Sequence, residues 1–142
     1  MHKHIGKFID QGIVAIRSVA LDFSGTSGSR ALFVVVDKTQ GAKDYTWNMQ
    51  LAKEAGAGKV DGNVVTVGDP NGANLRCTFI SPKALTLTGA IKASGSDEYF
   101  AIITVQKGAA PALKVVGEGL AATVTIGAQT ISFDGTKIVL GK

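Results

Sequence analysis

The chain has 142 residues, a length that suits one domain with its own buried core. Hydrophobic residues make up 45% and charged residues 18%, which excludes a disordered chain, and no apolar run approaches the roughly 18 residues that a membrane span needs. The net charge is +4 with scattered Lys and Arg, which excludes a clustered nucleic-acid footprint and mildly favours anionic partners such as acidic polysaccharides.

The first residues, MHKHIGKFIDQ, lack the plan of a signal peptide, because His4 and Lys7 are followed by the polar Asp10 and Gln11. We therefore expect either a cytoplasmic protein or a piece of a longer chain whose leader is missing. We expect residues 1–11 to fray. Both histidines, His2 and His4, lie in this segment, so we predict no metal site and no histidine catalysis.

Apolar and polar residues alternate with a period of two along most of the chain, and turn residues recur every few positions. The segment ALFVVVD is apolar on both faces, as in a strand buried between two layers. The only helical candidate, MQLAKEAGAG, contains glycines that argue against a long helix. Strands are expected in segments 12–23, 31–37, 45–52, 63–69, 74–81, 85–93, 98–106 and 113–119, and short strands separated by the turns IGAQ and FDGT are expected in 121–140.

This pattern predicts an all-β fold, and a count of about ten strands favours a single antiparallel two-sheet β-sandwich over residues 1–142. The order of the strands is not readable from the pattern. A closed barrel is the alternative architecture.

Few residues in this sequence can carry out chemistry. There is no GxSxG elbow, the glycine-rich segments lack a P-loop lysine, and the single Cys77 lies in an alternating apolar pattern that predicts a buried thiol. We therefore nominate no catalytic residue and no cofactor.

Arg17 lies near the middle of the expected strand 12–23, and Asp37 ends the expected strand 31–37. Asp37 follows an apolar strand directly, where a carboxylate accepts backbone hydrogen bonds or pairs with a cation such as Arg17 across the sheet. We interpret Arg17 and Asp37 as a structural pair.

Tyr45 and Trp47 lie two residues apart, so their rings point to the same side of a strand. Exposed, they form a stacking platform for sugar rings; buried, they belong to the core, which the continuing stripe of Met49 and Leu51 favours. With Lys43, which offers a charge for an acidic sugar, Tyr45 and Trp47 are the candidate substrate-binding residues.

The segments RSVALDFSG, ALFVVVDK and YTWNMQL, followed by VDGNVVTVGDPNGANLRCTFISPKALTLTG, resemble the C-terminal β-sandwich region of heparinase II/III-like polysaccharide lyases. The resemblance spans the chain from Arg17 onward. It implies a secreted or periplasmic enzyme in which a catalytic α/α toroid precedes the sandwich and uronate-containing polysaccharide is cleaved by elimination. Such sandwiches carry a histidine and zinc ligands in some members, but this chain has no histidine after His4, so these residues have no counterpart in it.

Three functions follow as alternatives. The first is an accessory domain that packs on a catalytic toroid, lines the cleft for an acidic polysaccharide and is inactive alone. The second is a free-standing carbohydrate-binding sandwich, which needs Tyr45 and Trp47 exposed together. The third is a ligand-free assembly module that associates with itself through strand edges. None of the three involves nucleic acid or a membrane.

Overall fold

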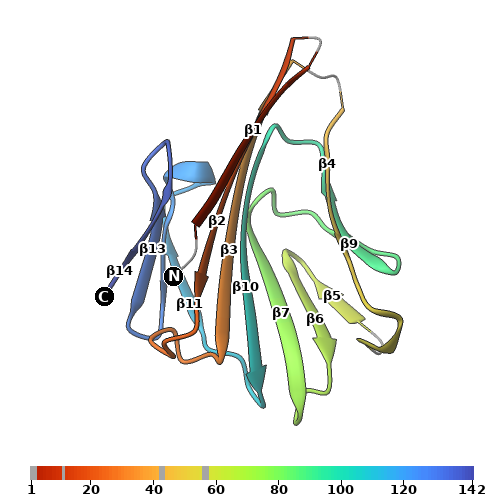
Figure 1. Cartoon of the computed structure of the whole chain (residues 1–142). Helices are drawn as coiled ribbons and strands as arrows, with labels where there is room; N and C mark the ends of the chain where they lie inside the picture. The colour runs from red at the N-terminus through yellow and green to blue at the C-terminus, as the bar shows by residue number, and fades with distance from the viewer. Residues whose placement is uncertain (1–2, 11, 42–43, 56–57) are drawn as a thin grey trace.

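A computed structural model describes residues 3–10, 12–41, 44–55 and 58–142. In this part of the chain, fourteen strands form three antiparallel sheets, so the predicted all-β, antiparallel architecture is confirmed. Figure 1 shows the three layers edge-on, with the largest sheet in the middle and a smaller sheet on each side.

The central sheet, called sheet A, has seven strands in the order β1-β2-β3-β10-β7-β6-β5. The long neighbours β2, β3, β10 and β7 form its middle, and the short β5 ends one edge. Its strands are β1 (Lys3–Asp10), β2 (Ile13–Asp22), β3 (Ala31–Gln40), β5 (Gly58–Asp61), β6 (Val64–Gly68), β7 (Ala73–Ser81) and β10 (Glu98–Lys107).

The two smaller sheets cover opposite faces of sheet A. Sheet B has the order β4-β9-β8, and sheet C the order β11-β12-β13-β14. Two short 3-10 helices, Lys53–Ala55 and Gly119–Ala121, lie in connections. The strands are β4 (Thr46–Gln50), β8 (Thr86–Leu87), β9 (Ala90–Ser94), β11 (Leu113–Val116), β12 (Thr123–Ile126), β13 (Gln129–Phe133) and β14 (Ile138–Gly141).

Each face of sheet A has its own hydrophobic core, because successive side chains of a strand point to opposite faces. Strand β10 illustrates this: Phe100 and Ile102 join the core against sheet C, while Tyr99, Ala101 and Ile103 join the core against sheet B. This double burial explains why β3 and β10 read as continuous apolar runs in the sequence.

The structure differs from the sequence expectation in the number of sheets and strands, which are three and fourteen in the described part rather than two and about ten. The segment 85–93 divides into β8 and β9, and β5 lies outside the segments in which the sequence predicts strands. Lys3–Asp10, which we expected to fray, pairs with β2 over its full length as β1. Alternation reveals strands but not which of them share a sheet, because that depends on contacts distant in sequence.

Among the described residues, no helix is long and apolar enough to cross a membrane.

Candidate functional site

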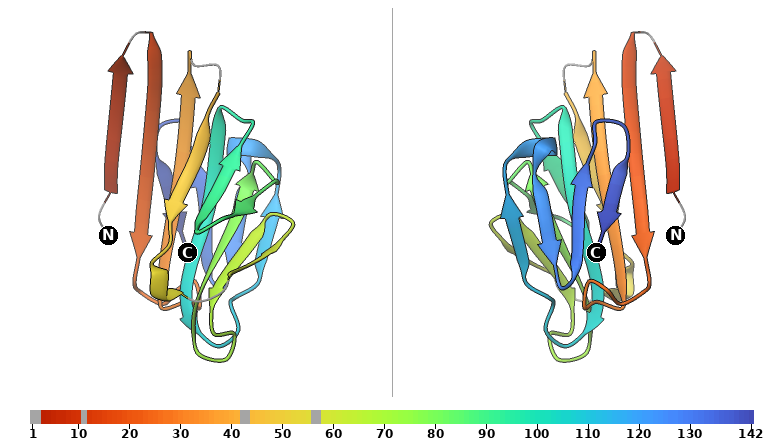
Figure 2. Two further views of the ribbon diagram at one scale, coloured as in Figure 1. Left: turned by 90° about the vertical axis from the view of Figure 1, so that its right-hand side faces the viewer. Right: turned by 90° about the vertical axis from the view of Figure 1, so that its left-hand side faces the viewer.

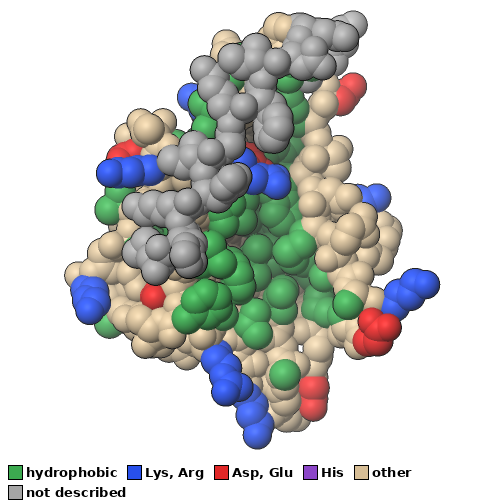
Figure 3. Space-filling model, in the orientation of Figure 1, with side chains coloured by type: hydrophobic (Ala, Val, Ile, Leu, Met, Phe, Trp, Pro, Cys, Tyr) green, Lys and Arg blue, Asp and Glu red, His purple; other side chains and the backbone are tan. Residues whose placement is uncertain are grey.

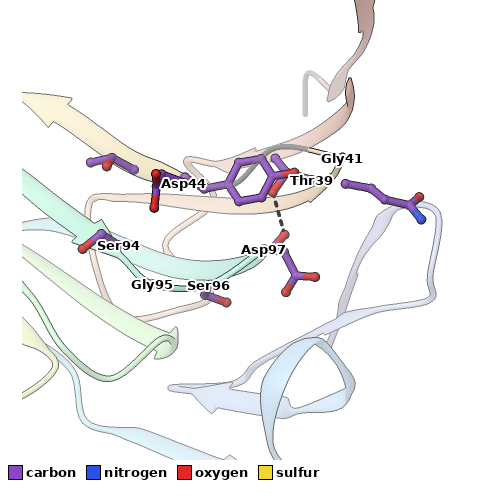
Figure 4. A pocket seen from close by; sticks show the side chains of 10 residues that line it. Thr39, Gly41, Asp44, Ser94, Gly95, Ser96 and Asp97 are labelled. Atoms are coloured by element: carbon purple, nitrogen blue, oxygen red, sulfur yellow. Dashed lines mark hydrogen bonds between the residues drawn. The ribbon is translucent and has the colours of Figure 1, made fainter. Parts of the chain in front are cut away.

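Two adjoining pockets lie at the end of sheet A where β3 ends and β10 begins. The larger pocket, of about 730 Å³, lies between the end of β3, the residues before and at the start of β4, and the turn that joins β9 to β10. Figure 4 shows Thr39 and Asp44 on one side of this pocket and the 94–97 turn on the other. Its lining is polar and comprises Thr39, Gln40, Gly41, Asp44, Tyr45, Thr46, Ser94, Gly95, Ser96 and Asp97.

Hydrogen bonds hold the two sides of the larger pocket together. The backbone N–H of Thr39 donates to the carbonyl oxygen of Asp97 at 2.8 Å, and the Thr39 hydroxyl donates to the same oxygen at 3.0 Å. The Ser96 hydroxyl donates to the carbonyl of Glu98 at 2.7 Å and closes the turn. The carboxylates of Asp44 and Asp97 remain exposed at the rim.

The smaller pocket, of about 220 Å³, lies between β2 of sheet A and β4 of sheet B and shares Thr39, Tyr45 and Thr46 with the larger one. Aromatic and aliphatic side chains make up most of its wall, and a single ion pair borders it. Its lining comprises Ala15, Ile16, Arg17, Asp37, Thr39, Tyr45, Thr46, Trp47 and Tyr99.

Arg17 and Asp37 form this ion pair, and they are direct neighbours in the register of β2 and β3. Arg17 donates from Nε to Asp37 Oδ1 at 2.7 Å and from Nη2 to Asp37 Oδ2 at 2.6 Å, a two-pronged geometry that fixes the guanidinium. The hydrogen bonds to Asp37 raise the pKa of Arg17. The Arg17 side chain is 54% exposed, whereas that of Asp37 is only 9% exposed.

Tyr45 and Trp47 do not form a flat exposed platform, because Trp47 is buried and Tyr45 is half-buried. The Trp47 ring packs edge-on against Phe79 with centroids 4.9 Å apart, so most of it belongs to the core between sheets A and B. The Tyr99 hydroxyl donates to the Tyr45 carbonyl at 3.1 Å and ties the start of β4 to β10. The two rings therefore do not form the exposed stacking platform that one interpretation of the sequence requires.

The structure brings Arg17, Asp37, Tyr45 and Trp47 together at the smaller pocket, while Lys43 lies outside the described residues. Sequence reasoning missed the polar residues of the larger pocket, above all Thr39, Ser96 and Asp97. The segment SGSD carries a turn signal, but nothing local indicates that this turn lies against Thr39.

The polar lining suits a hydroxyl-rich ligand, because hydroxyl and carboxylate groups that are open to solvent donate and accept hydrogen bonds in several directions. Within the described part of the chain, no group of three or more His, Cys, Asp or Glu side chains is placed to hold a metal ion.

A comparison with solved structures finds a distant likeness. No protein-family model matches the chain, and no curated protein matches it. Among solved structures, the chain is similar to the crystal structure of heparinase III, with 18% sequence identity and a TM-score of 0.49. The match covers 92% of this chain and 26% of heparinase III, so the chain spans about a quarter of that protein.

Proposed function

We propose that this chain is a carbohydrate-binding β-module whose saccharide site is the pair of adjoining pockets at the end of sheet A. The observation that carries the proposal is the larger pocket, which is big enough for sugar rings and presents hydroxyls, an amide and two carboxylates beside the Tyr45 ring. The smaller pocket continues this surface with aromatic walls.

The finer proposal is an accessory domain of a heparinase II/III-like lyase that lines a cleft for uronate-containing polysaccharide and packs on a catalytic toroid. The charged side chains around the two pockets favour one orientation of a bound uronate. Asp44 and Asp97 repel a carboxylate from the larger pocket, so a uronate carboxylate turns toward the half-exposed Arg17. Asp37 occupies only two of the five guanidinium N–H groups in the described contacts, which leaves donors for a ligand.

Binding is tested by isothermal titration calorimetry with uronate oligosaccharides and with neutral oligosaccharides of the same length. We expect saturable binding that Tyr45→Ala weakens about tenfold, because an aromatic side chain at the centre of a site carries much of the binding energy. Val116→Ser, on the exposed side of β11 in sheet C, is the control and leaves binding unchanged. If neither sugar class binds, the proposal fails.

The role of Arg17 is tested with the double variant Arg17→Met with Asp37→Asn, which removes both charges and leaves no buried carboxylate without a partner. We expect it to lose the preference for uronate over neutral oligosaccharides while neutral binding persists. An unchanged preference would remove Arg17 from the site. If the chain is an accessory domain, we also expect the purified chain to form no unsaturated uronate from the polysaccharide, which ultraviolet absorbance measures.

A further inference from the structure

An apolar strip on sheet A lies beyond the outer edge of sheet B. In the register of β2 and β3, Val19 pairs with Val35 and Leu21 pairs with Phe33, so these four side chains share one face. Phe33 and Val35 pack against the core beneath sheet B, which places the strip on that side. Phe23 extends the strip, with its ring edge-on to Phe33 at 5.9 Å.

The strip is open in the described structure. Phe23 is 66% exposed, and Val19, Leu21, Phe33 and Val35 are each only partly buried. In the left view of Figure 2, β1 and β2 lie to the left of β4, the edge strand of sheet B, so sheet B does not cover them. Figure 3 shows a broad hydrophobic surface in the hollow beside sheet B.

The outer edge of β4 offers backbone hydrogen-bonding groups beside this strip. Sheet B ends at β4, which pairs with β9 on one side and with no other described strand. The N–H of Leu51, just after β4, donates to the carbonyl oxygen of Gly89, just before β9. Because backbone groups alternate in direction along a strand, the N–H and C=O groups of Thr46, Asn48 and Gln50 point away from β9. This edge faces β2, because Thr46 and Trp47 line one pocket with Ala15 and Arg17.

From these two features we propose that the groove between β4 and residues 19–23 at the end of β2, beyond the Arg17–Asp37 pair of the smaller pocket, binds an extended segment of a partner polypeptide, which adds to sheet B as a further strand beside β4. Adjacent strands lie roughly 4.8 Å apart, so the added strand lies over the strip. Its apolar side chains, at every second position, bury the strip and continue the core that already joins sheets A and B.

The chemistry of the groove favours a polypeptide over a saccharide at this place. Beyond the Arg17–Asp37 pair, which borders the smaller pocket at one end of the groove, the floor is aliphatic and aromatic, so sugar hydroxyls turned toward this part of the floor would find no hydrogen-bond partner in it. The outward-facing backbone groups of β4, which pair with no described strand, repeat at the spacing of a strand, which a polypeptide matches residue for residue.

The test uses the whole chain and fluorescein-labelled peptides in fluorescence anisotropy. The probe alternates Val and Thr and carries a Lys at each end for solubility. One comparison peptide has the same composition with its Val residues in a single block, and a second has N-methyl groups on alternate backbone nitrogens. We expect saturable binding of the alternating peptide and at least about tenfold weaker binding of both comparison peptides, because they lose the side-chain period or the ladder hydrogen bonds.

Phe23→Ser removes the most exposed side chain of the strip and should weaken binding about tenfold. Val116→Ser is the matched control, because Val116 is 63% exposed on sheet C, away from the groove, and it should change nothing. Circular dichroism verifies that both variants fold. Equal binding of all three peptides, or no saturable binding, overturns the proposal. A concentration-dependent dimer that Phe23→Ser abolishes also overturns it, because a second copy then fills the groove.

Discussion

Burial sets the chemistry of the single thiol. Cys77 is fully buried on β7 among the residues beneath sheet B, and this burial raises the pKa of the thiol from 9.0 to about 12. The alternating pattern of NLRCTFIS predicts such a buried thiol, and the structure shows it.

This thiol makes folding stability depend on alkaline pH. Between about pH 9 and 12 the unfolded chain loses the thiol proton while the folded chain keeps it, so the free energy of unfolding falls as pH rises. Urea denaturation at several pH values measures this slope. Cys77→Ala should show a shallower fall over the same range. Equal slopes in both proteins would mean that the folded thiol titrates normally.

Thr104 carries a buried hydroxyl without a described partner. It is 1% exposed and lies directly opposite Arg76 in the register of β10 and β7. A buried hydroxyl without a hydrogen bond lowers stability, so replacement by an apolar group of the same shape is favourable. We expect Thr104→Val to raise the free energy of unfolding by up to ~1 kcal/mol in urea denaturation.

A clear loss of stability in Thr104→Val would contradict this expectation. It would show that the hydroxyl is bonded to a buried water shared with Arg76 Nε or Gln106 Oε1, which also lack described partners.

At the scale of elements, the strands follow from the sequence and their neighbours do not. Period two locates β2, β3, β7 and β10 within a few residues. The sequence also predicts the pairing of Arg17 with Asp37, and the register of β2 and β3 places the two residues directly opposite each other. The larger pocket could not be predicted, because Thr39 and Asp97 are 58 residues apart and meet through pairing of β3 with β10.

The turn between β12 and β13 shows how a glycine joins two distant segments. Gly127 has φ +56°, and a Cβ there would lie 2.7 Å from the backbone of Ser27. The N–H of Ala128 donates to the carbonyl of Thr26 at 3.1 Å, which fixes this close approach. Glycine is therefore required for both its backbone angle and its lack of a side chain.

We expect Gly127→Ala to lower the free energy of unfolding by more than the roughly 1–2 kcal/mol that left-handed backbone strain costs alone. Gly62→Ala is the matched control, because Gly62 has φ +57° with open space around its Cβ position. Thermal denaturation compares the two. Equal losses would show that the contact with Ser27 adds nothing to the backbone strain.

At the scale of the whole molecule, sheet A belongs to two cores at once. Strands β3, β7 and β10 contribute to the core against sheet C through Val34, Ile80 and Ile102. The same strands contribute to the core against sheet B, in which Trp47 lies. Loss of one core therefore removes the support of the strands that form the other, and we expect the three layers to unfold together.

Trp47 provides a local probe for this coupling, since it is the single tryptophan and reports on the sheet B side only. Ile131→Ala, in sheet C, removes a fully buried side chain on the opposite side and should cost about 2–5 kcal/mol. In urea titrations we expect Trp47 fluorescence and far-ultraviolet circular dichroism to give one shared midpoint, lowered equally in the variant. If Ile131→Ala lowers the dichroism midpoint but leaves the fluorescence midpoint in place, the two cores unfold separately.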